Sequence, residues 1–165
     1  MKKQKGFSLI ELLIVVAIIL IIAAIAIPNL LRSRMAANEA SAVGSLRTIN
    51  TAEVTYQTAY TTIGFAANIA ALGGSATTCA SATGAGSANA CLIDDVLSLT
   101  GVKSGYAFTA VGTAGTGSPL LVTYASTALP SVVGQTGQRA FCSDQSGVIR
   151  QNLTGTTCVN TDPAL

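Results

Sequence analysis

The sequence predicts an α+β protein in which one long N-terminal helix packs on a small antiparallel sheet. The first observation is an apolar run over residues 7–27, in which Glu11 is the only charged residue. The second is a helical periodicity that continues beyond Pro28 to about residue 60. The third is a set of short strand-like segments in the C-terminal half, separated by turn residues. The helix therefore precedes all the strands in the chain.

The apolar run has the length of a membrane-spanning helix. Its 21 residues would form a helix roughly 31 Å long, close to a hydrocarbon core of about 30 Å. Lys2, Lys3 and Lys5 precede the run, which favours a cytoplasmic N-terminus and an exported remainder. Arg32 and Arg34 beyond the run weaken this bias. A single acid inside such a segment is costly in lipid, so it is a candidate functional residue.

Residues 28–60 are expected to continue the helix in amphipathic form. Residues spaced by three, four or seven positions form one packing stripe. The members of this stripe are Leu31, Met35, Ala42, Leu46, Ile49, Glu53, Tyr56 and Tyr60. Pro28 has no amide hydrogen to donate to the carbonyl of Ala24, so we expect a helix kink at Pro28.

Residues 61–165 predict an extracellular globular head in three parts. Residues 61–90 consist mostly of Ala, Gly, Ser and Thr, which indicates a surface loop rather than a core element. A short helix is expected near residues 91–97. An antiparallel sheet is expected within residues 105–152, and residues 153–165 form a C-terminal tail. The expected strands are 106–111, 120–125, 138–143 and 148–152, with a hairpin turn at 144–147.

Four cysteines lie in the part of the chain that is expected to be exported, where oxidising conditions favour disulfides. Four cysteines allow three connectivities, and the sequence alone does not choose between them. The nearest-neighbour choice joins Cys79 to Cys91 and Cys142 to Cys158. A zinc site is the competing interpretation, but the chain has no Cys-x-x-Cys pair and no histidine.

The composition argues against catalysis and against nucleic-acid binding. Without histidine the chain lacks the usual catalytic base and the commonest metal ligand. It also has no Gly-rich phosphate loop. Lys2, Lys3 and Lys5 all precede the apolar run, and the chain without its first six residues has six Lys or Arg against seven Asp or Glu. Its net charge is then −1. No basic surface for nucleic acid is evident, and we expect no enzyme activity, no cofactor and no metal.

Two further motifs have simpler explanations. Asp94 and Asp95 could contribute to a calcium site, but calcium needs six to eight oxygen ligands and no EF-hand spacing is present. Such a pair more often caps a short helix. Asn152-Leu153-Thr154 matches the N-glycosylation pattern, for which chance is the better explanation.

The N-terminal segment resembles that of the type IV pilin superfamily, which includes type IV pilins and the pseudopilins of type II secretion. The residues that carry the resemblance are Lys5-Gly6-Phe7-Ser8-Leu9-Ile10-Glu11-Leu12 and Pro28-Asn29-Leu30. It implies that residues 1–6 are a leader cut off between Gly6 and Phe7, that Phe7 is then N-methylated, and that Glu11 supports filament assembly. The pair Cys142 and Cys158 also resembles the C-terminal disulfide loop of type IV pilins. The resemblance covers about residues 5–60.

Glu11 has two interpretations. Its carboxylate could satisfy the ammonium at Phe7 of the same chain and the amides of the first helical turn. Alternatively it pairs with the N-terminal ammonium of a neighbouring subunit and sets the register of a filament. The spacing does not separate the two, whereas the family resemblance favours the second.

The sequence therefore predicts a structural subunit that polymerises into a homo-oligomeric type IV pilus. The expected partners are a prepilin peptidase and methyltransferase, the pilus assembly machinery and other copies of the chain. The expected location is the bacterial inner membrane before assembly and the extracellular pilus afterwards. A type II secretion pseudopilin is the first alternative, and a monomeric membrane-anchored binding module is the alternative from another class.

Overall fold

A computed structural model describes residues 7–81 and 84–165 of the chain. It divides into two compact units, Met1–Arg34 and Met35–Leu165. The leader expected at residues 1–6, including Gly6, lies outside the described residues. The architecture is α+β, with a long N-terminal helix and a five-stranded antiparallel sheet, as the sequence predicts.

Helix α1 spans Leu9–Ala59 and contains Pro28 in its interior. Over the first unit its side chains are exposed, apart from a half-buried Ala23. From Met35 onwards one stripe of the helix is buried. The buried residues are Glu39, Ala42, Val43, Ser45, Leu46, Ile49, Ala52, Glu53 and Tyr56. The spacing of three or four residues between them is that of one helical face, so this part of α1 is the core helix of the second unit.

The sheet is a meander with strand order β1-β2-β3-β4-β5, all neighbours being antiparallel. Its strands are β1 (Val102–Lys103), β2 (Tyr106–Ala114), β3 (Leu121–Pro130), β4 (Ala140–Asp144) and β5 (Arg150–Asn152). The sequence predicted four of the five strands and missed β1; the expected ranges were too short for β2 and β3 and too long for β4 and β5. Strand β3 runs further than expected because its buried positions include the small residues Ser126 and Ala128, which give a weak apolar signal.

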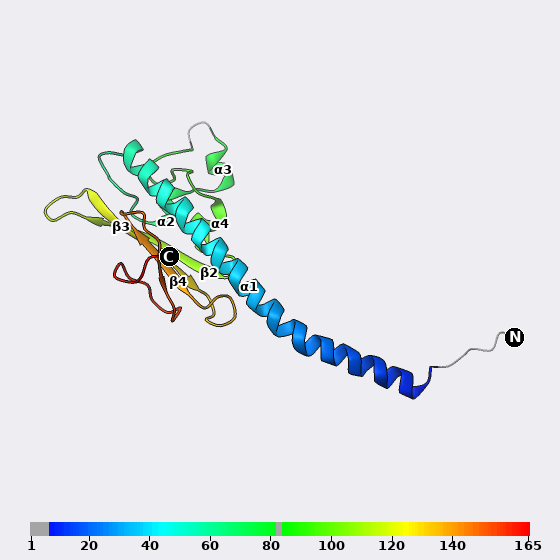
Figure 1. Cartoon of the computed structure of the whole chain (residues 1–165). Coiled ribbons are helices and arrows are strands. Elements are labelled where there is room, and N and C mark those ends of the chain that lie inside the picture. Colours follow the sequence, from blue (N-terminus) through cyan, green and yellow to red (C-terminus); the bar gives the residue numbers. More distant parts are fainter. Residues whose placement is uncertain (1–6, 82–83) are drawn as a thin grey trace. The chain divides into compact units, whose positions relative to one another are not determined.

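One face of the sheet and the buried stripe of α1 form the main hydrophobic core (Figure 1). Tyr106, Phe108 and Ala110 alternate along β2 with their side chains in this core, while Thr109 points to solvent. Phe141 of β4 packs beside Tyr106, with a ring-centroid distance of 6.1 Å. Alternate burial along the strands therefore selects which face of the sheet meets α1.

The small-residue segment after α1 differs from the expected surface loop. It contains the short helices α2 (Ile69–Leu72) and α3 (Ala76–Cys79), and Ala66 and Leu72 are completely buried. A third short helix, α4 (Asp95–Leu99), contacts α2. A Cβ atom on Gly73 would lie 2.2 Å from the Cβ of Ser98. Small residues here permit close packing, a role that composition alone does not distinguish from loop formation.

A charged cluster ties α1 to the sheet. The Glu39 carboxylate accepts the backbone amides of Gln138 (2.9 Å) and Arg139 (3.1 Å), and it pairs with the Arg139 guanidinium at 2.7 Å. The same guanidinium donates to Gln151 of β5 at 2.8 Å and lies over the ring of Phe141. Burial alone would raise the pKa of Glu39, but these hydrogen bonds and the positive charge lower it below its ordinary value.

Replacing Glu39 by Gln should destabilise the head by about 2 kcal/mol. The amide has nearly the same shape, but it lacks the charge and cannot accept hydrogen bonds from both backbone amides and the Arg139 guanidinium. Chemical unfolding of the full chain in detergent, followed by tyrosine fluorescence, measures this loss. Asp95→Asn removes an exposed acid from α4 and should change stability by no more than about 0.5 kcal/mol. Equal effects from the two variants would contradict the structural role of Glu39.

Candidate functional site

The start of α1 holds the candidate assembly residue. Ser8 precedes the helix, and its backbone amide donates to Oε2 of Glu11 at 3.0 Å. The amide of Leu12 donates to the Ser8 carbonyl at 3.3 Å. Ser-x-x-Glu is the capping-box pattern, and the Ser8–Glu11 contact is the reciprocal half in which the acid reaches back to the cap amide. Glu11 therefore contacts the cap amide of its own helix, and its role in assembly stays a prediction.

The surface around Glu11 is almost wholly apolar. Phe7 is 85% exposed, Leu20 is 63% exposed and Leu30 is 70% exposed. Soluble monomers rarely expose apolar patches of more than a few hundred Å², so a surface of this kind marks contact with lipid or protein. By length and composition, α1 is the one helix in the described part of the chain that could cross a membrane. The exposed apolar half of α1 and the acid at its start make up the candidate site.

Pro28 lies inside α1, with helical assignment on both sides. Its ring nitrogen has no hydrogen, so it leaves the carbonyl of Ala24 without its usual intrahelical donor. The kink expected at Pro28 stays a prediction.

The four cysteines form the nearest-neighbour pairs. Cys79 is bonded to Cys91 with a Cα–Cα distance of 5.7 Å, and Cys142 to Cys158 with a distance of 5.6 Å. The first disulfide joins the end of α3 to the chain just before α4. The second attaches the C-terminal tail to β4. Both lie in the second unit, where they close segments that contribute few large side chains to the core.

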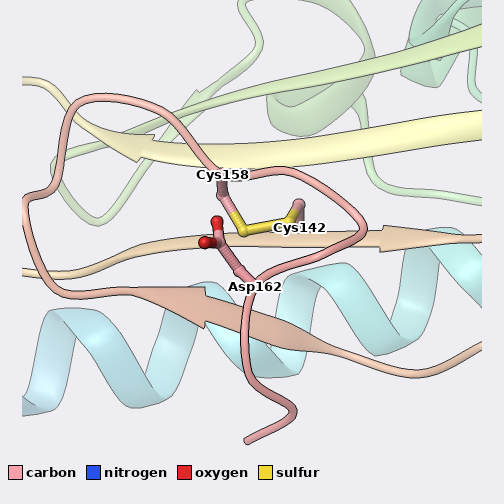
Figure 2. Close-up of side chains that lie close together, drawn as sticks. All are labelled: Cys142, Cys158 and Asp162. Atoms are coloured by element: carbon pink, nitrogen blue, oxygen red, sulfur yellow. A yellow bond between two sulfur atoms is a disulfide. The ribbon is translucent and has the colours of Figure 1, made fainter.

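Cys142, Cys158 and Asp162 lie close together beside β4 (Figure 2) and are the group of potential metal ligands found among the described residues. The two sulfurs are bonded to each other, so they do not offer the thiolates that zinc requires. The Asp162 carboxylate accepts the amide of Val159 at 2.9 Å and the side-chain amide of Asn152. The cluster therefore holds the tail on the sheet. The Asn152 amide nitrogen, the atom that N-glycosylation would modify, is engaged in the same contact.

Asp94 is the N-cap of α4, as the helix-capping interpretation predicted. Its Oδ1 accepts the Leu97 amide at 2.9 Å, and its Oδ2 pairs with Lys103 Nζ at 2.7 Å. Burial opposes ionisation of Asp94, but the hydrogen bonds from Lys103 and Leu97 outweigh it and lower the pKa of this carboxyl. Both oxygens thus have protein donors, and nothing in this arrangement favours calcium.

A cavity of about 380 Å³ opens beside β3, β4 and the C-terminal tail. Its lining offers hydroxyl groups such as that of Thr123, together with Asp144, Arg150 and Asn160. The Asp144 carboxylate already accepts the amide and hydroxyl of Ser146.

Two acids on α1 have roles that the sequence pattern did not predict. Glu39 contacts Arg139, which lies 100 positions later in the chain. Glu53 was expected on the packing stripe, but its complete burial was not expected. The available signal was an acid at a core position of a helical stripe, since a carboxyl is almost never fully buried without a partner.

The disulfide pairing is directly testable. Non-reducing peptide mapping of the mature protein should link Cys79 to Cys91 and Cys142 to Cys158. Replacing both members of either pair by Ser should lower the free energy of unfolding by about 3 kcal/mol, because each closes a loop of 12 or 16 residues. Detection of a peptide joining Cys79 to Cys142 would show that the pairing is wrong.

The similarity to known proteins lies in the N-terminal segment. The prokaryotic N-terminal methylation motif matches residues 1–27. The chain is 64% identical over 39 residues to the type IV wide pilus major component PilA4 of Thermus thermophilus, covering 24% of this chain and 30% of that protein. It is 44% identical over 54 residues to the type IV major pilin protein PilA of Myxococcus xanthus, covering 33% of this chain and 24% of that protein.

These matches span less than one third of the length of either relative. No solved structure matches the chain. The matched residues nevertheless include the segment that carries the candidate site, with Phe7 and Glu11. Over this segment the chain is similar to type IV pilins.

Proposed function

We propose that the chain is a non-enzymatic structural subunit that polymerises into a type IV pilus. The observation that carries this proposal is the apolar first half of α1, which is exposed along its length and carries one acid at its start. Residues 7–34 do not bury one another's side chains, so this surface needs contact with lipid or with other protein chains. In this proposal lipid covers the surface first and other copies of the chain cover it after maturation, and the methylation motif over residues 1–27 supports such a maturation step.

In this proposal the precursor enters the inner membrane with its basic leader in the cytoplasm. A prepilin peptidase cuts between Gly6 and Phe7 and so frees the amino group of Phe7, which is then methylated. The apolar helix remains as the membrane anchor because the cut precedes it. The second unit, with its two disulfides, is the exported head and becomes the filament surface.

Assembly then moves apolar helices from lipid into a helical core. Lipid tails are about as apolar as leucine, so this transfer gives little hydrophobic driving force and specific contacts must fix the arrangement. Glu11 can supply one such contact by pairing with the Phe7 ammonium of another subunit. Two unit charges 4 Å apart attract by about 4 kcal/mol at an effective dielectric constant near 20, partly offset by desolvation. The pair would therefore set axial register more than overall stability.

A type II secretion pseudopilin and a monomeric membrane-anchored binding module are the two alternatives to a pilus subunit. Both of the relatives named above are pilus components, and the Asp94 carboxylate is occupied by Lys103, so the observations favour a pilus subunit over a type II secretion pseudopilin. A monomeric anchored binding module needs only an apolar span. It gives no reason for an acid within that span, where leucine would partition into lipid better.

Processing gives a first test of the proposal. Mass spectrometry of the mature protein should find an N-terminus at Phe7 that carries one methyl group. Gly6→Val should leave the precursor uncut, because a branched side chain crowds the subsite of the peptidase. A mature filament whose subunits still begin at Met1 would rule out this maturation route.

The two interpretations of Glu11 are separated by a pair of substitutions. Glu11→Val removes both the charge and the acceptor for the Ser8 amide. This variant should insert and be cleaved, yet give few filaments and more processed monomer in the membrane. Glu11→Gln keeps an acceptor for that amide but loses the charge, so an intermediate filament yield is expected.

The measurement is the yield of sheared filaments beside the amount of processed monomer in the membrane. Normal yield from Glu11→Val would eliminate the register mechanism. Full restoration by Glu11→Gln, with Glu11→Val defective, would show that the acid acts only through the cap of its own helix.

A further inference from the structure

Glu53 is a buried carboxyl with too few hydrogen-bond donors. It lies on the core stripe of α1 and is completely inaccessible to solvent. Its Oε2 accepts the backbone amide of Ala66 at 2.9 Å. Its Oε1 is buried and has no hydrogen-bond partner among the residues that the structure describes. Glu39, the other buried acid of α1, receives two backbone amides and a guanidinium, so the two acids occupy opposite electrostatic environments.

Among the residues that the structure describes, the groups that face Glu53 supply no compensating positive charge. Burial raises the pKa of the Tyr56 phenol on α1, and Tyr60 and the Glu53 charge raise it further. Burial likewise raises the pKa of the Tyr124 phenol on β3, and the charges of Glu53 and of Asp144 on β4 add to this effect. Both phenol hydrogens are committed elsewhere. Tyr56 donates to the Ser87 carbonyl at 2.6 Å, and Tyr124 donates to the Asn50 side chain at 3.1 Å.

The ion pairs of the described residues lie elsewhere as well. They are Lys103 with Asp94 and Arg139 with Glu39. An ionised Glu53 would therefore be a buried anion with one neutral donor, which is strongly unfavourable. A neutral carboxyl at the same place keeps its acceptor for Ala66 and avoids the cost of a buried charge.

The contact with Ala66 holds the connection between α1 and the sheet. Within residues 60–68 the chain leaves α1 and runs beside the start of β3, where Phe65 donates to the Leu121 carbonyl and Leu121 donates to the Ile63 carbonyl. Gly64 has a φ of 90°, and a Cβ atom there would lie 2.1 Å from the Leu121 oxygen. Because the backbone at Gly64 is packed so closely against Leu121, residues 60–68 have little freedom to move relative to β3. The hydrogen bond between Glu53 and Ala66 is therefore the contact with α1 that can open.

We propose that Glu53 is a proton-dependent latch that holds residues 60–68 on α1 when its carboxyl is neutral and loosens this junction when the carboxyl ionises. The proposal concerns the head alone and goes beyond the role of the chain in a filament. The Glu53 carboxyl is completely buried, one of its oxygens has a single donor and the other has none among the described residues. The groups that face it are neutral or negative.

The direction of the pH effect follows from linkage. Burial raises the pKa of Glu53 to about 7, although the Ala66 hydrogen bond lowers it somewhat. Once the junction opens, the carboxyl meets water and returns to its ordinary value near 4.5. The closed form thus binds more protons than the open form between these two values. Its stability is complete below about pH 4.5, falls as pH rises to about 7, and is level above that.

The test is hydrogen exchange of the full mature chain in detergent, read by mass spectrometry from pH 5 to pH 9 and corrected for intrinsic exchange rates. Protection of the amides in residues 61–67 should fall by up to about tenfold per pH unit between pH 5 and pH 7, then level off above about pH 8. Amides of β3 and β4 serve as the internal reference, and their protection should change far less.

Glu53→Gln should make the protection of residues 61–67 independent of pH, whereas Asp95→Asn, which removes an exposed acid, should keep the dependence of the natural chain. The natural chain decides the matter by itself if Glu53→Gln fails to fold. Constant protection of residues 61–67 from pH 5 to pH 9 in the natural chain would overturn the proposal. So would a folded Glu53→Gln variant that retains the full pH dependence.

Discussion

The need to cover the apolar half of α1 is the constraint on which the rest of the structure depends. Over residues 9–34 the helix exposes leucine, isoleucine and valine on all sides, and no other element packs on them within the described part of that unit. A helix that is apolar all round requires lipid or protein neighbours. In the proposed function a membrane and then a filament supply these neighbours, and the one acid near the helix start is the proposed means of selecting between them.

The head meets a different requirement, which is to stabilise a small core built from many small residues. Its large buried side chains are few, and Tyr56, Tyr106 and Phe141 are among the largest. Covalent and charged contacts supplement this core. The two disulfides fix the segment around α3 and the C-terminal tail, while Glu39 joins α1 to β5 through Arg139. Glu53 stands apart from this pattern, because its burial adds a conditional contact rather than a permanent one.

Local patterns in the sequence were sufficient for the helix, for four strands and for the class of fold, because periodicity and alternation are properties of neighbouring residues. Glu11 was found in the same way, as an acid in an apolar run. The roles of Glu39 and Gly73 depend on residues far away in the chain, and composition carries no record of such contacts. Strand β1 is only two residues long and pairs with β2 across a tight turn, so it left no alternation to detect.

The central claim is that copies of this chain replace lipid around the first half of α1. Helical reconstruction of sheared filaments from electron micrographs tests it most directly, because side-chain density shows what surrounds each helix. We expect the side chains of residues 9–31 to lie at the filament centre against the same residues of other copies, with the five-stranded sheets outside. Filaments of this chain in which residues 9–31 face solvent, or in which the sheets form the centre, would contradict the account.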